Sequence, residues 1–437
     1  MKKFFYSHQK SVSYAAILLA VIFLFVMGFY LNEQVSAVES ATYKNLKLFN
    51  EALDIIDKNY VEKVDSKTLI QGGINGMVKS LDPHSTFLTA DMHKELQTET
   101  RGSFGGIGIE ITIVNDILTV VSPIEDTPAF LAGIKAGDQI VKIDDKPTKG
   151  ISILEAVKKL RGPENTTVKL SIMRKDHVKP NDYTIRRAII NVKSVKFNIY
   201  ENNIAYIRIS SFQEKTAEEL SKAIKDIEKK AGRLSGLILD LRNDPGGLLD
   251  QAVKVSDAFL KTGTIVTIKG RGKNIDNKFS AKDNGNEPTC PIVVLVNEGT
   301  ASASEIVAGA LQDNGRAVIL GTQTFGKGSV QTVIPFEDGS ALKLTTAKYY
   351  TPKGRSIQAE GIAPDIYLDF VKPPEEKNHE LTVREKDLKG HIVGDDEKIE
   401  KTGAPKTPDD LLKDNQLKAA IDLIKSWKIF EKINNKS

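Results

Sequence analysis

Hydrophobic and polar positions first separate near the start of the chain, where Ser11–Asn32 runs for 22 residues without a charged side chain. At about 1.5 Å per residue, a helix of this length spans a hydrocarbon core of about 30 Å. Three lysines precede it: Lys2, Lys3 and Lys10. Because basic flanks stay in the cytoplasm, we expect residues 1–37 to be a membrane anchor or signal segment, with the body exported. Val35-Ser36-Ala37 is typical of a signal-peptidase site, so cleavage is an alternative to a retained anchor.

Two amphipathic stripes lie near the two ends of the remaining chain. Their apolar residues recur at spacings of three and four, which predicts helices. The first stripe is Leu46, Phe49, Leu53, Ile56 and Tyr60, and the second is Leu417, Ile421, Ile424 and Trp427. The first indicates a helical N-terminal domain, residues 38–102, and either packs within that domain or forms a dimer contact. The second is expected to cover the N-terminal helical region or another subunit. A segment rich in Lys, Glu, Asp and Pro precedes it, so residues 372–437 are expected to be a charged linker and a C-terminal helix.

Residues 189–371 alternate short apolar runs with helical patterns. The expected strands are Ile204–Ile209, Leu237–Leu241, Ile292–Val296 and Ala317–Leu320, and the expected helices are Thr216–Ala231, Leu248–Leu260 and Ala303–Asn314. This alternation predicts an α/β domain.

Residues 103–188 have a different texture, with glycine-rich turns, several strand patterns and one expected helix, Ile153–Leu160. In the segment Gly105-Gly106-Ile107-Gly108, glycines let the main chain turn its amides toward a terminal carboxylate, and the adjacent strand edge can add an extended peptide. A glycine-rich hairpin without a ligand is the alternative. Arg161 follows the helix and is either a surface residue or the partner of a carboxylate from the ligand or the neighbouring domain.

Composition and charge narrow the possible functions only a little. The 437 residues carry 61 basic and 57 acidic side chains, so the net charge of +4 favours neither nucleic acid nor an acidic substrate. The single cysteine, Cys290, excludes intrachain disulfides and is expected to be a packed thiol. His84 has no Cys/His cluster near it in the sequence, so we expect a structural role and neither a metal nor a cofactor.

Ser302 stands where an expected strand turns into a helix, a position suited to a nucleophile. A serine hydroxyl needs a base, which is usually histidine, but no histidine lies between Asn191 and Phe370. Lys327, inside a glycine turn, is the remaining base, because burial lowers the pKa of a lysine and makes the neutral amine available. Ser–Lys pairs are a known variant of the Ser–His–Asp arrangement.

Two other interpretations of these motifs compete with catalysis. Ser302-Ala-Ser-Glu305 fits a capping box, in which the serine only closes a helix. The segment from Gly321 to Lys327 nearly matches a phosphate-binding P-loop, but Gly328 follows the lysine and the next residues alternate like a strand. A P-loop must open a helix, so this second match fails.

Five motifs in one order resemble those of the carboxy-terminal processing peptidases, which are tail-specific proteases of the Ser–Lys type with a PDZ domain. They are Leu81-Asp-Pro-His-Ser85, the PDZ-like segment 103–188, Asp240-Leu-Arg-Asn-Asp-Pro-Gly246-Gly247, Gly299-Thr-Ala-Ser302-Ala-Ser-Glu305 and Phe325-Gly-Lys327-Gly-Ser-Val-Gln331. Together they cover about residues 43–370.

This resemblance implies roles for particular residues. Ser302 would be the nucleophile, Lys327 the general base and Gln331 the residue that orients the lysine amine. The implied oxyanion donors are the N–H groups of Gly247 and Ala303, where fixed donors would stabilise the transition state. The implied carboxylate-binding loop consists of Gly105, Gly106, Ile107 and Gly108. Asp313 follows late on the helix after Ser302 and is a candidate supporting residue.

The sequence therefore predicts a multidomain α+β protein with a helical N-terminal region, a PDZ-like domain, an α/β peptidase core and a helical tail. The expected function is cleavage of proteins or peptides that the PDZ domain selects by their unstructured, free C-terminal ends. The expected location is the bacterial cell envelope, anchored in the inner membrane with the catalytic body on the periplasmic or extracytoplasmic side. A homo-oligomer is left open, and nucleic acid is not expected. Two alternatives are a non-catalytic PDZ scaffold and a crotonase-like acyl-transfer enzyme, whose sites also use glycine-rich oxyanion turns.

Overall fold

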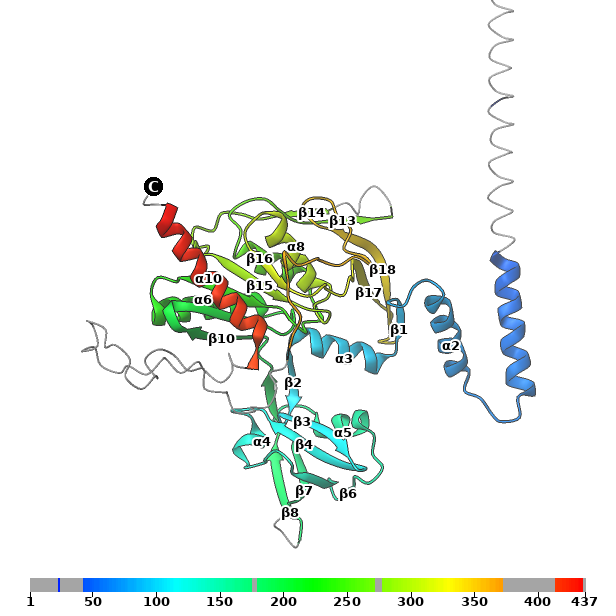
Figure 1. Cartoon of the computed structure of the whole chain (residues 1–437). Coiled ribbons are helices and arrows are strands. Elements are labelled where there is room, and N and C mark those ends of the chain that lie inside the picture. Colours follow the sequence, from blue (N-terminus) through cyan, green and yellow to red (C-terminus); the bar gives the residue numbers. More distant parts are fainter. Residues whose placement is uncertain (1–22, 24–41, 175–178, 272–276, 372–412, 435–437) are drawn as a thin grey trace, which may run out of the picture. The chain divides into compact units, whose positions relative to one another are not determined.

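The structure, a computed structural model, describes residues 23, 42–174, 179–271, 277–371 and 413–434 (Figure 1). Apart from Phe23, the expected anchor and its cleavage site lie outside these residues, as does the charged segment up to residue 412. No helix in the described ranges is long and apolar enough to span a bilayer. The chain divides into two compact units, one ending at Phe87 and the other beginning at Leu88.

The first unit contains a helix over residues 42–59, followed by α2 (Ser66–Lys79). The first helix confirms the prediction from its apolar stripe. A side chain on Gly73 of α2 would meet the Phe49 ring at 2.9 Å, so that ring packs closely on α2. Leu46 and Tyr60 are nevertheless 57% and 59% exposed, so much of the stripe has no cover within this unit.

A tight turn follows α2 and contains His84. The Asp82 carboxylate Oδ1 accepts hydrogen bonds from the main-chain N–H groups of His84 and Ser85, each at 2.8 Å. This arrangement is an Asx-type turn, in which the aspartate substitutes for a main-chain acceptor. The segment thus forms a defined turn, and the structural role expected for His84 stays a prediction.

The second unit begins with β1's last residue, Leu88, and α3, and continues into a β-rich domain. β1 (Thr86–Leu88) and α3 (Ala90–Arg101) precede this domain. The elements of the β-rich domain are β2 (Ser103–Gly106), β3 (Ile109–Val114), β4 (Ile117–Pro123), α4 (Pro128–Leu131), β5 (Gln139–Ile143), β6 (Lys146–Pro147), α5 (Ile153–Leu160), β7 (Thr167–Met173), β8 (Asn181–Arg186) and β9 (Ala188–Asn191). Strands β3, β4, β5, β7 and β8 form a sheet in that order, with β6 beside β5, while β2 pairs with β9. Inward side chains of this sheet, such as Val120 and Leu170, bury Ala156 and Leu160 of α5.

The α/β domain follows and carries the larger core. Its elements are β10 (Val195–Tyr200), η1 (Glu201–Asn203), β11 (Ile204–Ile209), α6 (Thr216–Ala231), β12 (Gly236–Asp240), α7 (Leu249–Asp257), β13 (Thr264–Gly270), β14 (Asn277–Ser280), β15 (Ile292–Val296), α8 (Ala303–Asp313), β16 (Val318–Gly321), β17 (Ser329–Pro335), β18 (Ala341–Tyr350), β19 (Ile366–Tyr367) and α10 (Asn415–Asn434). The main sheet has the order β10-β11-β12-β15-β16-β19 and is parallel except for the β10–β11 pair. Strands β17, β18, β13 and β14 pair antiparallel in a second sheet.

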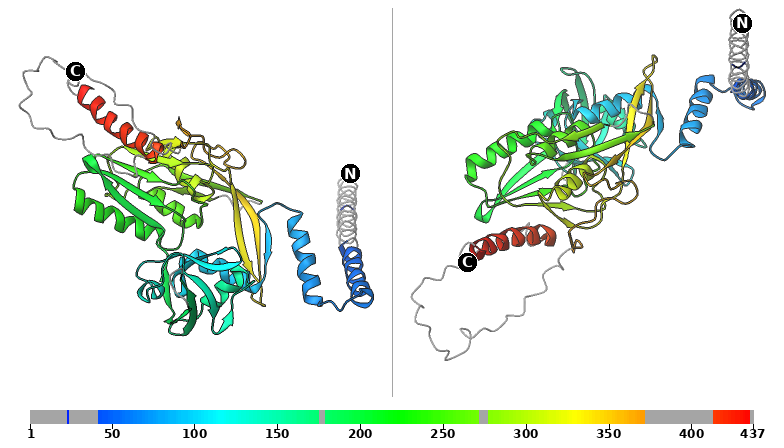
Figure 2. Two further views of the ribbon diagram at one scale, coloured as in Figure 1. Left: turned by 60° about the horizontal axis from the view of Figure 1, so that its bottom comes forward. Right: turned by 90° about the horizontal axis from the view of Figure 1, so that it is seen from above.

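Both faces of the main sheet are covered, as a buried parallel sheet requires. Leu237 and Leu239 of β12 pack with α6, α7 and α8, whereas Ile238 between them faces α10. Figure 2 shows α6 and α10 on opposite sides of this sheet. The multidomain α+β fold expected from the sequence is thus confirmed.

The prediction of what the C-terminal apolar stripe packs against was wrong. Leu417, Ile421 and Ile424 are buried against the main sheet, not against the N-terminal helical region or another subunit. The second face of the main sheet is apolar, and α10 covers it. Trp427, the fourth residue of the stripe, is 52% exposed.

Candidate active site

Ser302 is the residue immediately before α8, at the carboxyl end of the buried strand β15 and the loop after it. Its backbone has φ 57° and ψ −112°, a region that residues other than glycine rarely occupy. Such strain persists where the surroundings enforce it, as at the strand-to-helix turns that carry serine nucleophiles. The residue is only 7% exposed.

Glu305, one turn into α8, connects this serine to the lysine turn. Its fully buried carboxylate accepts hydrogen bonds from the main-chain N–H groups of Ser302, at 2.8 Å, and Lys327, at 2.9 Å. It also accepts from the N–H of Gly326, at 2.7 Å, and from the Thr324 hydroxyl, at 2.5 Å. The capping contact expected from the sequence is therefore present, but the same carboxylate also holds the loop that carries Lys327.

Lys327 lies half-buried just before β17, so a strand and not a helix follows it. This confirms that the segment is not a P-loop. Burial lowers the pKa of the Lys327 amine, the positive charge of Lys343 lowers it further, and the charge of Glu305 opposes both effects. The amine is thereby shifted toward the neutral form that a general base requires.

Gln331 is half-buried on β17 near this turn. Its side-chain amide donates to the Ser329 hydroxyl at 2.8 Å and carbonyl at 3.2 Å, and to the Thr345 hydroxyl at 3.5 Å. None of these acceptors is Lys327, so the orienting role implied for Gln331 stays a prediction.

The glycine turn after β12 lies directly against Ser302. A Cβ on Gly246 would stand 2.9 Å from the Ser302 Cβ and 2.8 Å from the Ala303 nitrogen, so only glycine allows this approach. Gly247, at φ 145°, packs equally closely on Phe212. Within the described chain, the N–H groups of Gly247 and Ala303 donate to no acceptor. Two free amides beside the serine are what an oxyanion site needs.

Asp244, in the same turn, is a titratable residue that the sequence did not single out. Its carbonyl accepts hydrogen bonds from Ala301 N–H, at 2.9 Å, and from the Ser304 hydroxyl, at 3.0 Å. Its buried carboxyl uses Oδ1 to accept from Gly246, while Oδ2 has no partner among the described residues. Burial raises the pKa of Asp244 to about 7, against the lowering effects of the Gly246 hydrogen bond, Ser304 and Arg208.

Tyr349, on β18, was also missed. Its N–H donates to the carbonyl of Gly328 at 2.7 Å, which places it beside the lysine turn, and the Ser302 side chain lowers the pKa of its hydroxyl. Burial raises the pKa of Tyr349 to about 12, so the phenol is neutral at ordinary pH. No local sequence signal marks this residue, because the contact depends on how the second sheet packs on α8.

Asp313 is at the far end of α8 from Ser302. Its carboxylate bonds to the Arg355 guanidinium at 2.5 Å and to the Lys353 N–H at 2.9 Å. The segment that contains those residues continues to Ala359, whose N–H donates to the Gly326 carbonyl at 2.8 Å. Among the described residues, Asp313 bonds to neither Ser302 nor Lys327, and its supporting role stays a prediction.

The PDZ-like loop joins β2 to β3. A Cβ on Gly105 would stand 2.2 Å from the Gly162 carbonyl oxygen, and one on Gly108, at φ 78°, would stand 2.3 Å from the Thr127 Cβ. Both positions therefore require glycine, whereas Ile107 is buried in the domain core and Gly106 ends β2.

Arg161, after α5, pairs with a neighbouring element. Its guanidinium bonds to Glu95 of α3 at 2.5 Å and stands 4.5 Å from the centre of the Phe104 ring. The sequence left open a surface arginine, a pair with a ligand carboxylate and a pair with a carboxylate of the neighbouring domain. The structure shows the last of these, with Glu95 outside the β-rich domain.

Two expectations about other chemistry concern Cys290 and metals. Cys290 is buried, and burial raises the pKa of its thiol, which confirms a packed thiol. Across the described ranges, no group of three His, Cys, Asp or Glu residues could hold a metal ion.

Comparisons with known proteins cover nearly the whole chain. The model of peptidase family S41 matches residues 203–368, the PDZ domain model matches residues 105–183, and the activating protease CtpB N-terminal domain model matches residues 29–92. The carboxy-terminal-processing protease of Bartonella bacilliformis is 46% identical over 418 residues, which cover 92% of this chain and 95% of that protein. The carboxy-terminal processing protease CtpA of Bacillus subtilis is 39% identical over 365 residues, 82% of this chain and 77% of that protein. A solved structure of the photosystem II D1 C-terminal processing protease is 32% identical, covers 74% of this chain and 92% of its own, and superposes with a TM-score of 0.44. The chain thus belongs to the carboxy-terminal processing proteases of peptidase family S41 and is a serine-type peptidase with a PDZ domain.

Proposed function

We propose that this peptidase is an exported, membrane-anchored endopeptidase of the Ser–Lys type that selects unstructured protein C-termini through its PDZ domain. The observation that carries the catalytic part is the shared Glu305 carboxylate, whose Oε2 accepts hydrogen bonds from the main-chain N–H groups of both Ser302 and Lys327. Two separate loops are thereby kept together next to the Gly246-Gly247 turn.

The proposed reaction follows from the roles of these groups. Neutral Lys327 takes the proton of the Ser302 hydroxyl as the oxygen attacks the substrate carbonyl carbon. The N–H groups of Gly247 and Ala303 stabilise the resulting oxyanion. Protonated Lys327 then gives its proton to the departing amine, and water hydrolyses the acyl-enzyme with Lys327 again as base.

Variants of the two residues test this chemistry on an unfolded protein substrate. Ser302→Ala and Lys327→Ala should each lower kcat by several orders of magnitude, and the double variant should be no worse than either. Lys327→Arg should also be inactive, since arginine remains charged and cannot act as a base. Substantial turnover by a folded Lys327→Arg protein would exclude lysine as the base.

Recognition of a free C-terminus is supported by the glycine-requiring loop Gly105–Gly108 beside the strand β3. A peptide that adds to this strand would place its carboxylate at the loop. A pair of peptides that differ only in a C-terminal acid or amide tests this role. The acid should be cleaved markedly faster, and equal rates would remove the carboxylate-reading function.

Membrane anchoring and export are supported by the uncharged run Ser11–Asn32 and the lysines before it. We place the body on the periplasmic or extracytoplasmic side of the inner membrane of a bacterial cell. Protease added to spheroplasts should digest the body and spare a short N-terminal stub. Protection of the body until the membrane is broken would reverse this orientation.

A homo-oligomer is part of the same proposal and rests on the exposed first stripe. Leu46 and Tyr60 present large apolar side chains that a second copy could cover. Leu46→Glu should lower the mass measured by sedimentation of the purified protein. The same mass for the parent and the variant would remove this stripe as the contact.

A further inference from the structure

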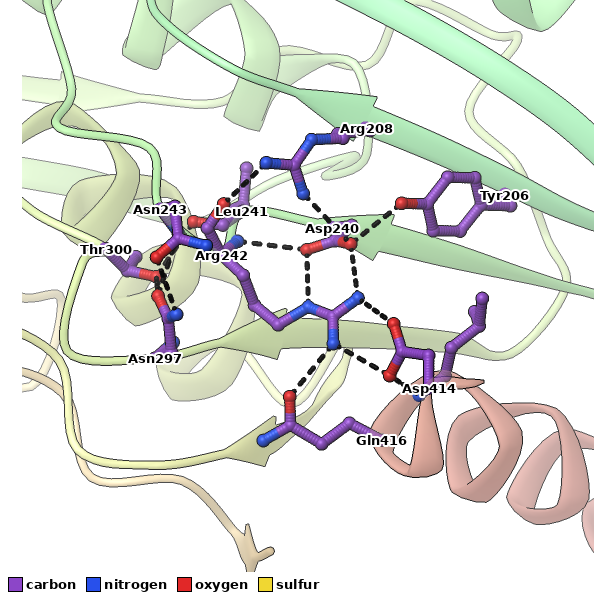
Figure 3. A network of polar contacts seen from close by, with 11 residues as sticks. Tyr206, Arg208, Asp240, Leu241, Arg242, Asn243, Asn297, Thr300, Asp414 and Gln416 are labelled. Atoms are coloured by element: carbon purple, nitrogen blue, oxygen red, sulfur yellow. Dashed lines mark hydrogen bonds and ion pairs between the residues drawn. The ribbon is translucent and has the colours of Figure 1, made fainter. Parts of the chain in front are cut away.

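The turn between β12 and α7 is fixed on one side by the loop that leads to Ser302 (Figure 3). The Asn297 carboxamide oxygen accepts from the Asn243 N–H at 2.8 Å, and its Nδ2 group donates to Asn243 Oδ1 at 2.9 Å. The Thr300 hydroxyl donates to the Leu241 carbonyl at 2.8 Å. These contacts fix one side of the turn, and Arg242 makes the contacts on its other side.

Arg242 connects the other side of the turn to the C-terminal helix. Its guanidinium donates to the two carboxylate oxygens of Asp414, at 3.0 and 2.7 Å, and to the Gln416 side-chain oxygen, at 2.9 Å. Gln416 is in turn bound to the Leu368 carbonyl at 2.7 Å. Figure 3 shows Asp414 and Gln416 at the end of α10 reaching the arginine.

The same guanidinium also binds Asp240, the last residue of β12. Asp240 is fully buried and accepts from the Tyr206 hydroxyl at 2.8 Å, from Arg208 at 3.3 Å and from Arg242 at 2.7 Å. Arg208 also donates to the Arg242 carbonyl at 3.1 Å, so main chain and side chain are fixed together.

Charge in this network is balanced only when the C-terminal helix is docked. Two arginines, Arg208 and Arg242, face two carboxylates, Asp240 and Asp414. The Arg242 and Asp240 side chains are 9% and 0% exposed, so water cannot replace a missing partner well. Loss of one partner from a buried ion pair leaves an uncompensated charge, and movement of the turn would expose that charge to water.

We propose that Asp414 is a positioning residue for the peptidase reaction, acting through Arg242 on the turn that carries Gly246 and Gly247. Docking of α10 thereby sets the geometry of the oxyanion donors, although the helix itself contacts no reacting atom. This inference rests on the proposed role of Gly247 as an oxyanion donor. The sequence stripe accounts for the apolar docking of α10, but not for this polar link.

The test uses Asp414→Asn in the full chain, because Asp414 also caps α10. It accepts the Leu417 N–H at 2.9 Å, and asparagine caps a helix as well as aspartate does. The substitution therefore keeps the cap and removes the charge. Asp422→Asn, on the exposed face of the same helix, is the matched control. Asp414→Glu, which retains a carboxylate, should restore part of the lost activity.

We expect Asp414→Asn to lower kcat by about 10- to 100-fold with little change in KM, since only transition-state contacts are lost. Affinity for a peptide boronate, whose tetrahedral adduct with Ser302 occupies the oxyanion site, should fall in parallel. A combined Arg242→Gln and Asp414→Asn protein should be no worse than Arg242→Gln alone. The Asp422→Asn control should match the parent in both measurements.

An Asp414→Asn protein whose kcat and boronate affinity match the parent would overturn the inference, as would a loss confined to KM or to thermal stability. If that protein does not fold, Gln416→Ala, which removes one bond to Arg242, should give a smaller loss of kcat, and an unchanged kcat would overturn the inference. Full activity and boronate affinity in a Gly247→Pro protein, which lacks the N–H at this position, would instead refute the oxyanion assignment itself.

Discussion

Ser302 and Lys327 are joined through a single atom, because Oε2 of Glu305 accepts hydrogen bonds from both of their main-chain N–H groups, at 2.8 and 2.9 Å. The serine is held at the start of a helix, whereas the lysine sits in a turn before a strand of the other sheet. Glu305 therefore helps to fix the distance between these two elements, which the Phe325 N–H also joins by donating to the Thr300 carbonyl at 3.0 Å.

Replacing Glu305 with glutamine should impair catalysis even though the side chains have the same shape. One carboxylate oxygen becomes an NH2 group, which cannot accept from the N–H groups that now face it. Charge-assisted hydrogen bonds are worth about 1.5–3 kcal/mol, so we expect kcat to fall by about 10- to 100-fold. Peptidase kinetics on the purified variant measure this loss.

Glu298→Gln is the control for this experiment, since Glu298 lies in the loop that leads to α8, is exposed and accepts a hydrogen bond from the Thr322 hydroxyl. It should keep the parent kcat. A Glu305→Gln protein with full activity would show that the carboxylate is not needed to hold the two loops.

The sequence predicted this part of the fold well for a local reason. The apolar runs Ile204–Ile209 and Ile292–Val296 are bounded by polar turns, and both are strands with those limits in the structure. The helix after Ser302 ends at Asp313, one residue before the expected end. The sequence pattern identified Glu305 only as a cap, because its bonds to Gly326 and Lys327 depend on how distant segments pack.

Removing the positive charge of Lys343 should raise the pKa of Lys327. Burial lowers the pKa of Lys327 most and Lys343 lowers it next, so Lys343→Gln removes the second cause and leaves the first. The base is then neutral only at higher pH. The rising limb of kcat/KM against pH should therefore move to higher pH, with a similar plateau.

Lys348→Gln provides the comparison for that profile, since Lys348 is exposed on the same strand. Its profile should overlay that of the parent protein. A Lys343→Gln profile with an unmoved limb would mean that the limb does not report Lys327.

Neutralising Asp244 should stabilise the folded protein at alkaline pH. The folded pKa is about 7, above the unfolded value of about 3.9, so the native state binds the proton more tightly. The cost of burying the charge is absent below about pH 4, grows as the pH rises to about 7, and is full above that. Asp244→Asn should therefore raise the free energy of unfolding by on the order of 4 kcal/mol at pH 8.5 and little at pH 4.

Urea unfolding at the two pH values measures this difference, with Asp422→Asn as an exposed control that should change stability equally at both. Arg208 is the charged residue whose field favours the ionised Asp244. A stability gain independent of pH would indicate that Asp244 is not protonated in the native protein.

The packing of α10 shows what a sequence pattern cannot predict, namely the partner of an apolar helix face. Periodicity identified Leu417, Ile421 and Ile424 as one apolar face, but periodicity does not show which surface that face packs against. The main sheet offers Ile204, Ile238 and other apolar side chains on its second face, and the helix covers them. In the same way, membership of the peptidase family, and not the pattern of glycines, answers the scaffold and acyl-transfer alternatives.

Tyr349→Phe should slow the reaction by removing one hydroxyl from the vicinity of Ser302. The ring is 5% exposed and stays in place in the variant, whereas the hydroxyl, whose pKa the Ser302 side chain lowers, is lost. A neutral hydrogen bond contributes about 0.5–1.5 kcal/mol, so kcat and the rate of Ser302 labelling by a fluorophosphonate should each fall by about 3- to 10-fold. Because the pKa of Tyr349 is about 12, the hydroxyl does not titrate near neutral pH, and the pH profile should keep its position.

Tyr350→Phe, at the next residue of β18, is the matched control and should label at the parent rate. Equal labelling rates for Tyr349→Phe and the parent would show that the hydroxyl does not orient the nucleophile.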